Sequence, residues 1–281
     1  MDKVVVLAAG LGTRMREGDG EGLTEAQRLA ADSGVKALIP IDRPFLDYVL
    51  TTVADAGFRR VCLIIGPDHD ELRRHYREVE AQRLQFEFAV QPRPGTGTAD
   101  ALTAAREFVG DDPFLTINSD NHYPLDALQA LRDLDGPGLP GFDRTALVEQ
   151  SNIPAQRIER FAIIETDADG SLRRIVEKPA PELMESLGQS LGVSMNCWRF
   201  DERIFAACAA IEPSERGELE LPSAVQYAIE HLETRFQVVP VSGPVLDLSS
   251  RDDIESVVER VSVAVAKSRI PFAATLLSVK R

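Results

Sequence analysis

Cysteine, histidine and long apolar runs are scarce in this chain of 281 residues. The three cysteines, Cys62, Cys197 and Cys208, lack CxxC spacing and lie among apolar residues, so we expect reduced core thiols and no disulfide framework. The four histidines lack the spacing of zinc ligands. No stretch reaches the roughly 18 consecutive apolar residues of a membrane-spanning helix, and no apolar signal segment follows a basic start. These absences favour a cytoplasmic protein without a membrane partner.

Positive charge is also in short supply. The chain has 31 lysines and arginines against 45 aspartates and glutamates, which is a formal net charge of −14 at pH 7. Such an acidic molecule repels the backbone of nucleic acids, so we expect no nucleic-acid partner. An anionic ligand would need cations gathered locally, or a bound metal ion. Each lysine or arginine beside a glycine-rich loop is therefore informative.

The first half of the chain alternates apolar runs of strand length with amphipathic helices, which is typical of a mainly parallel α/β sheet with helices on its faces. There we expect strands at residues 4–8, 61–65, 86–90 and 114–117, and helices at 45–56, 70–82 and 99–108. The runs shorten from about residue 142. There we expect strands at residues 145–148, 161–165, 172–177, 193–200 and 236–241, and helices at 201–210, 221–232 and 252–267.

A glycine-rich loop directly follows the first predicted strand. It reads Gly10-Leu-Gly12-Thr13-Arg14, and such a loop brings backbone N–H groups against a phosphate while the arginine adds charge. The loop lacks the Gly-Lys-Ser/Thr ending of the P-loop and the third glycine of the dinucleotide fingerprint. It therefore predicts a phosphorylated ligand without naming one.

Two other predicted strands also end at polar residues. Gln91 follows the strand at 86–90, and Asp120 follows the strand at 114–117. Because functional groups of open α/β sheets lie at the carboxyl ends of strands, we expect Gly10, Gln91 and Asp120 to share one cleft. Asp120 has an alternative role as the cap of its turn. Residues 24–27 have the spacing of a capping box and predict a short helix beside the loop, ending near Gly34.

The chain resembles the sugar-1-phosphate nucleotidylyltransferases, the family of glucose-1-phosphate thymidylyl-, uridylyl- and adenylyltransferases. Motifs similar to those of the family occur in order over nearly the whole chain, at residues 7–15, 36–40, 91–92, 97–101, 119–121, 177–179, 194–198, 216–221 and 246–249. The resemblance implies a Rossmann-like three-layer α/β/α sheet with a smaller mixed β subregion on the sugar side. It implies one domain, with a nucleotide-binding half at residues 1–141, a sugar-binding half at 142–250, and a C-terminal helix and tail at 251–281.

The resemblance also implies roles for individual residues. The catalytic set would be Arg14, Lys36 and Asp120, and magnesium would be held by Asp120 and Asp247. The nucleotide would be bound by Leu7, Ala8, Ala9, Gly10, Gly12, Thr13, Arg14, Gln91, Pro94, Gly97 and Thr98. The sugar phosphate would be bound by Asn121, Glu177, Lys178, Ser194 and Asn196. Asp247 has an alternative role as a cap for the helix that begins near residue 252.

The implied reaction transfers a nucleoside monophosphate from a nucleoside triphosphate to a sugar 1-phosphate. Two anions must meet, so alignment and charge neutralisation are the main tasks, and Mg²⁺ suits them. Ser119 and Asn196 replace glycines of the family, and Pro222-Ser223 replaces a Thr-Asp pair, so the sugar and base stay open. A phosphorylated alcohol or cyclitol as acceptor, and a non-catalytic regulatory subunit that binds an NDP-sugar, remain alternatives.

Two further points stay open at the level of sequence. Residues 97–101 resemble adenylyltransferases, whereas residues 216–221 resemble thymidylyltransferases, so the hints on the nucleobase conflict. The apolar stretch at residues 270–279 is a candidate contact between subunits of a homo-oligomer. Its alternative role is to pack back onto its own domain.

Overall fold

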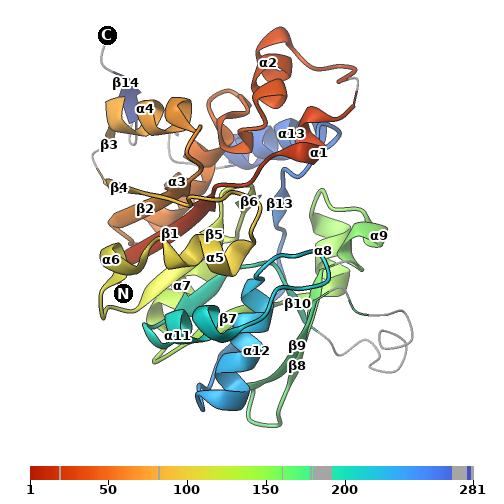
Figure 1. Cartoon of the computed structure of the whole chain (residues 1–281). Helices are drawn as coiled ribbons and strands as arrows, with labels where there is room; N and C mark the ends of the chain where they lie inside the picture. Colours follow the sequence, from red (N-terminus) through yellow and green to blue (C-terminus); the bar gives the residue numbers. More distant parts are fainter. Residues whose placement is uncertain are drawn as a thin grey trace.

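The computed structural model describes residues 1–18, 20–81, 83–159, 161–177, 179, 192–267 and 277–279. Its centre is a ten-stranded sheet in the order β4-β2-β1-β5-β11-β7-β10-β8-β9, with β12 pairing with β7 (Figure 1). One half of the sheet is parallel, made of β1 (Lys3–Ala8), β2 (Arg60–Ile65), β4 (Gln85–Val90) and β5 (Phe114–Asn118). Apolar residues run without alternation along β1 and β2 because both faces of these strands are covered.

The other half of the sheet is mixed. It contains β7 (Gly138–Asp143), β8 (Ala162–Thr166), β9 (Leu172–Val176), β10 (Gly192–Ser194), β11 (Trp198–Phe200) and β12 (Gln237–Val241). Strand β11 joins the two halves, since it pairs antiparallel with β5 on one side and with β7 on the other. The mixed sheet that the sequence predicts for the second half is therefore continuous with the parallel one.

Helices cover both faces of the sheet, as the alternating pattern predicts. One apolar cluster joins the sheet to α3 (Phe45–Asp55), α4 (Asp70–Glu78), α7 (Leu125–Asp133) and α13 (Asp253–Lys267). The other joins it to α5 (Thr98–Thr103), α6 (Arg106–Val109), α11 (Arg203–Ala210) and α12 (Leu221–His231). Along β1, Val4 and Val6 belong to the first cluster, and Val5 and Leu7 belong to the second. The three-layer α/β/α architecture is confirmed.

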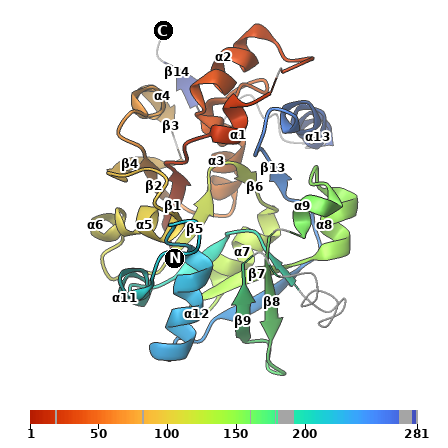
Figure 2. The ribbon, with the colours of Figure 1, turned by 45° about the vertical axis from the view of Figure 1, so that its right-hand side comes forward.

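Shorter elements lie around the rim of this core. These are α1 (Thr13–Arg16), α2 (Glu25–Ser33), the 3₁₀ turn η1 (Lys36–Leu38), α8 (Arg144–Gln150), α9 (Ala155–Ile158), and the two-stranded ribbon of β6 (Asn121–His122) with β13 (Leu246–Asp247). Figures 1 and 2 show α2 and α13 at one end of the molecule, with α12 and the β8–β9 hairpin at the opposite end. None of the helices in the described part of the chain is long and apolar enough to cross a membrane.

Two predicted strands were wrong. Residues 145–148 belong to helix α8, because the Asp143 carboxylate accepts a hydrogen bond from the Ala146 N–H at 2.7 Å and caps a helix there. The predicted strand at 193–200 is broken into β10 and β11. Asn196 adopts a positive φ of 52°, and the Tyr123 hydroxyl donates to the Met195 carbonyl at 2.8 Å. The chain therefore turns between the two strands, and the Tyr123 hydrogen bond holds the turn.

Two predicted helices have different limits. The helix at 99–108 is divided into α5 and α6, because Ala104 and Ala105 close a tight turn with N–H bonds to carbonyls three residues back. The helix at 70–82 ends at Glu78, and the chain continues as β3 (Val79–Ala81), which pairs with β14 (Leu277–Val279). Of the predicted subunit contact at 270–279, only residues 277–279 are described, and they pair with their own chain.

Candidate active site

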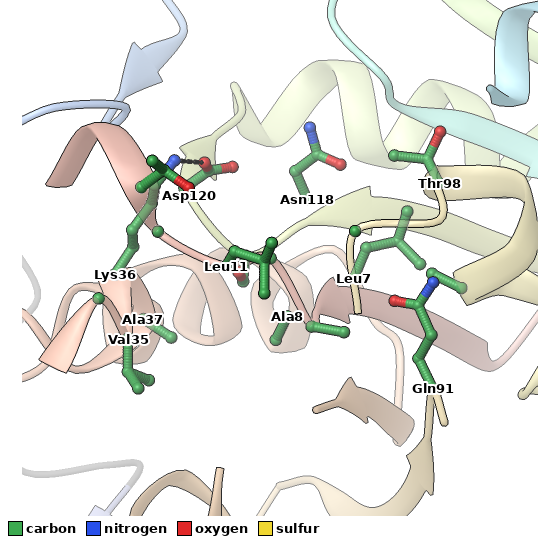
Figure 3. Close-up of a pocket in the computed structure, with 18 of the residues that line it drawn as sticks. Leu7, Ala8, Leu11, Val35, Lys36, Ala37, Gln91, Thr98, Asn118 and Asp120 are labelled. Atoms are coloured by element: carbon green, nitrogen blue, oxygen red, sulfur yellow. Dashed lines mark hydrogen bonds and ion pairs between the residues drawn. The ribbon is translucent and has the colours of Figure 1, made fainter. Parts of the chain in front are cut away.

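A cavity of about 370 Å³ opens at the carboxyl ends of β1, β4 and β5 (Figure 3). Gly10, Gln91 and Asp120 all line it, as expected from three strands that end at one edge. Its walls are the glycine-rich loop, η1, the start of α5 and the turn after β5. The lining residues are Leu7, Ala8, Ala9, Gly10, Leu11, Gly12, Thr13, Arg14, Gly34, Val35, Lys36, Ala37, Gln91, Gly95, Gly97, Thr98, Ala101, Asn118, Ser119, Asp120 and Glu218.

The glycine-rich loop owes its shape to a backbone contact with Gly34. Gly12 has a φ of 64°, and a Cβ at this position would lie 2.0 Å from the Gly34 carbonyl oxygen. Only glycine allows the two backbones to approach this closely. A Cβ on Gly10, in contrast, would meet nothing within 4 Å, so the loop leaves room for a ligand there.

A buried arginine holds this loop against α2. Arg251 donates to the Met15 carbonyl at 2.8 Å and to the Arg16 carbonyl at 3.3 Å, and it pairs with the Asp32 carboxylate. Arg16 in turn donates to the Ser33 carbonyl at 2.8 Å. The predicted capping box of α2 is present, since the Thr24 and Gln27 side chains each accept from the other residue's N–H. Helix α2 is therefore fixed to the rim of the cavity.

Charged groups meet on one wall of the cavity. The Lys36 Nζ lies 2.8 Å from the Asp120 Oδ2, and these side chains are only 17% and 21% exposed (Figure 3). Arg14 is exposed at the rim, and in the described part of the chain it pairs with no acid. Two cations thus line the cavity of a molecule whose net charge is −14, together with two carboxylates, those of Asp120 and Glu218.

The opposite wall is built around Gln91. The segment that follows α11 packs against this wall, with the Ala99 N–H donating to the Leu219 carbonyl and the Leu219 N–H donating to the Thr96 carbonyl, both at 2.8 Å. A Cβ on Gly97 would lie 2.2 Å from the Leu219 oxygen, so glycine is needed there too. This packing brings Glu218 to the cavity, from a motif that the sequence singles out at residues 216–221.

Asp247 lies near Asp120, on the wall opposite Gln91, but does not line the cavity. Its carboxylate accepts from the Asn121 amide at 3.0 Å and from the Ser249 hydroxyl at 2.9 Å, and it pairs with Arg157 at 3.0 Å. Burial raises the pKa of Asp247 to about 6, and the nearby Asp120 charge adds to the increase. The two acids that the sequence assigns to one metal are therefore neighbours, and only Asp120 faces the open space.

The predicted nucleotide residues gather at this cavity, with one exception. Leu7, Ala8, Ala9, Gly10, Gly12, Thr13, Arg14, Gln91, Gly97 and Thr98 all line it, and Pro94 does not. Gly34, Val35 and Ala37 line the cavity without having been predicted as site residues, and they reach it because the loop packs on Gly34. The Lys36 motif is the only signal that points to them.

The predicted sugar-side residues do not line this cavity. Glu177 borders a second cavity of about 1050 Å³ between β9 and α12. Ser194 is buried in β10, Asn196 lies in the turn after it, and Asn121 is buried against Asp247. Lys178 lies outside the described residues. Among the residues that the structure describes, no group of three or more His, Cys, Asp or Glu side chains is placed to hold a metal ion.

Comparison with known proteins gives three findings. A family model described as "Nucleotidyl transferase" matches residues 3–242. The chain is 32% identical over 234 residues to a glucose-1-phosphate thymidylyltransferase of Streptomyces antibioticus. The aligned segment covers 82% of this chain and 58% of the relative. The chain is 26% identical over 263 residues to the UTP–glucose-1-phosphate uridylyltransferase AglF of Haloferax volcanii, covering 92% and 96% of the two chains.

The fold also matches solved structures. A UDP-glucose pyrophosphorylase complexed with UDP-glucose aligns with a TM-score of 0.71 at 17% sequence identity, covering 95% of this chain and 100% of the other. Several of the curated relatives are longer proteins, and the chain spans only 57–58% of the length of three of them, the Streptomyces antibioticus enzyme included.

Proposed function

The chain belongs to the nucleotidyl transferase family, and from this premise we propose that it joins a nucleoside triphosphate to a sugar 1-phosphate, releasing an NDP-sugar and pyrophosphate. One observation carries the proposal. A glycine-rich loop, the Lys36–Asp120 pair and the buried Gln91 amide line a single cavity at the ends of three strands. This arrangement supplies backbone donors and cations for phosphates beside a separate polar group for a base.

The proposed mechanism relies on positioning and charge. The backbone of residues 10–13 cradles the phosphates of the triphosphate, and Arg14 neutralises the departing pyrophosphate. Lys36 bridges the α-phosphate and the incoming sugar phosphate, whose oxygen attacks the α-phosphorus in line. Gln91, Gly97 and Thr98 hold the base. Phosphate binding places a new anion beside Lys36, which then shares its charge between that anion and Asp120.

The acids beside the cavity fit a magnesium ion. Mg²⁺ prefers oxygen ligands and needs only one or two carboxylates, since water and phosphate complete its shell. Asp120 faces the cavity, and the Asp120 charge is close enough to raise the pKa of Asp247. When bound, the ion would supply positive charge at the reacting phosphates. We propose Asp120 as its first ligand and Asp247, which Arg157 now holds, as the second.

The sugar side and the wider setting are also part of the proposal. Glu177 and Lys178 position the sugar together with Asn121, Ser194 and Asn196. We further propose a single domain, since one sheet runs through both halves. Free buried thiols at all three cysteines fit a cytoplasmic location. The pairing of β14 with β3 favours packing of residues 277–279 on their own domain over a subunit contact at these residues.

The proposal is tested by a matrix of five nucleoside triphosphates against several sugar 1-phosphates, read by pyrophosphate release. We expect turnover for at least one pair, loss of turnover with EDTA, and recovery with Mg²⁺. A phosphorylated alcohol and a cyclitol phosphate belong in the same matrix. If turnover occurs only with one of these two compounds, that compound replaces the sugar 1-phosphate as the proposed acceptor. Binding of an NDP-sugar by the isolated chain without any turnover would show a regulatory subunit instead.

A further inference from the structure

We propose that Asp100 determines which nucleobases the cavity accepts, by fixing the orientation of the Gln91 side-chain amide. The inference rests on the proposed function, since it takes the wall around Gln91 to be the base-binding side. It concerns a residue that does not line the cavity and acts through one that does.

The amide of Gln91 is held by its nitrogen. The Gln91 side chain lies at the end of β4, where the residue is only 3% exposed. Its Nε2 lies 2.8 Å from the Asp100 Oδ2, 3.0 Å from the Thr96 Oγ1 and 3.3 Å from the Gly97 carbonyl oxygen. The Thr96 hydroxyl also contacts the Asp100 carboxylate, so the three side chains form one network.

This network permits one orientation of the amide. The Asp100 carboxylate and the Gly97 carbonyl only accept hydrogen bonds, so a reversed Gln91 would place its oxygen against two other oxygens. The Nε2 therefore stays on the side of Asp100, and the Oε1 is left on the side of Leu7 and Ala8, as Figure 3 shows. The cavity is offered a fixed acceptor rather than an amide that can turn either way.

A fixed acceptor distinguishes bases by the ring nitrogen that faces it. This nitrogen is N3 in a pyrimidine and N1 in a purine. Uracil, thymine and guanine carry a hydrogen on it, next to a carbonyl group, whereas cytosine and adenine present a lone pair there. A lone pair facing the Gln91 oxygen leaves two acceptors unpaired in a buried site, which is costly. For either ring size, the base with a ring N–H is therefore expected to bind more tightly.

Asp100 also has a purely structural role to exclude. It lies in the first turn of α5, where a carboxylate favours the helix. Asp126 also lies in the first turn of its helix, α7, is exposed, and accepts from the Ala127 N–H at 2.9 Å. An Asp126→Asn variant therefore controls for the loss of a first-turn charge.

The test is calorimetric binding of two matched pairs, UTP with CTP and GTP with ATP, to the full chain in the presence of Mg²⁺. We expect the wild-type protein to favour UTP over CTP, or GTP over ATP, by about 30-fold or more in Kd. This ratio corresponds to roughly two buried acceptors left without a hydrogen bond in the disfavoured complex. In Asp100→Asn, whose new amide can donate to a reversed Gln91, this ratio falls about tenfold. Asp126→Asn keeps the wild-type ratio.

A double variant separates orientation from stability. In Gln91→Ala no amide remains to be oriented, so adding Asp100→Asn to it leaves the ratio unchanged. Equal wild-type affinity within both pairs, including no binding at all, would overturn the inference. So would a ratio in Asp100→Asn within twofold of wild type, or a further change on the Gln91→Ala background. Because binding is measured without an acceptor, a failure of turnover would count against the proposed function alone.

Discussion

At the scale of single residues, the Lys36–Asp120 pair is the centre of the site. Its 2.8 Å contact joins η1 to the turn after β5 across 84 residues of sequence, and both side chains are mostly shielded from water. Shielding strengthens charge interactions, so each group matters more here than on the surface. The pair brings the proposed phosphate-binding cation and a candidate metal ligand to one point.

Removing either member of this pair should abolish most of the activity. We expect Lys36→Ala and Asp120→Asn each to lower pyrophosphate release by about 100-fold or more, since each removes charge that acts on the reacting phosphates. Thermal melting of both variants should show a folded protein. Arg235→Ala is the matched control, because it breaks the exposed Arg235–Asp169 pair at 2.6 Å and should leave turnover unchanged. Near-normal release from either site variant would contradict the assignment.

His122 makes a separate prediction about pH. Its Nε2 lies 2.9 Å from the Thr52 hydroxyl, and burial lowers its pKa from 6.5 to about 4. The unfolded chain therefore takes up a proton at a higher pH than the folded chain does. The stability from the neutral ring is present above pH 7 and is lost as the pH falls from about 7 to 4. This group should reduce the free energy of unfolding by about 2 kcal/mol between pH 7.5 and pH 5.

The measurement for His122 is urea unfolding of the wild-type protein and of His122→Gln across this pH range. As the solution becomes acidic, the unfolding free energy of the wild-type protein should fall more than that of His122→Gln, because glutamine does not titrate. Parallel curves for the two proteins would show that His122 titrates normally in the folded state.

Individual site residues differ in how far sequence patterns reveal them. Gly10, Gln91 and Asp120 can be found because each follows a predicted strand, and parallel strands end at one edge. The pairing of Asp247 with Arg157 cannot be found this way, since it depends on packing between β13 and α9, 90 residues apart. Asp100 lies within the motif at residues 97–101, but its contact with Gln91 cannot be found from the sequence, because acids are common in the first turn of a helix.

At the scale of elements, the glycine-rich loop depends on its contact with the end of α2. The two glycines of the loop have different reasons to lack a side chain. Gly12 meets the Gly34 backbone and has a positive φ, whereas Gly10 borders open space. The first is needed to build the loop, and we infer that the second is needed for the ligand.

Alanine variants should separate these two roles. Gly12→Ala should lower the free energy of unfolding by about 3 kcal/mol, from backbone strain together with the clash. Gly170→Ala, with a φ of 80° and no atom within 4 Å of the added Cβ, measures the strain alone. Gly10→Ala should leave stability within about 0.5 kcal/mol but raise the KM for the triphosphate about tenfold or more. An unchanged KM for Gly10→Ala would remove this residue from the phosphate site.

Local signals predicted the elements whose ends are marked in the sequence. The capping box of α2 and the proline and glycine that flank α3 lie next to the elements they delimit. Helix α8 was missed because its cap, Asp143, is also the last residue of strand β7, and the short run Thr145-Ala-Leu-Val148 contains residues that favour strands. The ribbon of β6 and β13 has only two residues on each side, and no periodicity can reveal it.

At the scale of the whole molecule, the parallel and mixed halves share one sheet. Strand β11 connects them through Trp198, which is fully buried, lies opposite Thr116 of β5, and stacks on Phe200 at 5.6 Å between ring centroids. The parallel half follows from the alternation of strands and helices. The order of the mixed half does not, because β11 enters the sheet between β5 and β7 from a distant part of the sequence.

This continuity predicts a single unfolding transition. Trp198 is the only tryptophan of the chain and lies at the junction, so its fluorescence reports on the boundary while far-UV circular dichroism reports on all elements. In urea both signals should give the same midpoint. Val5→Ala in β1 and Ile204→Ala in α11 remove buried groups from opposite halves, and each should destabilise the protein by about 2 kcal/mol. Each variant should shift both signals equally, whereas a midpoint that moves for one probe alone would divide the chain into two domains.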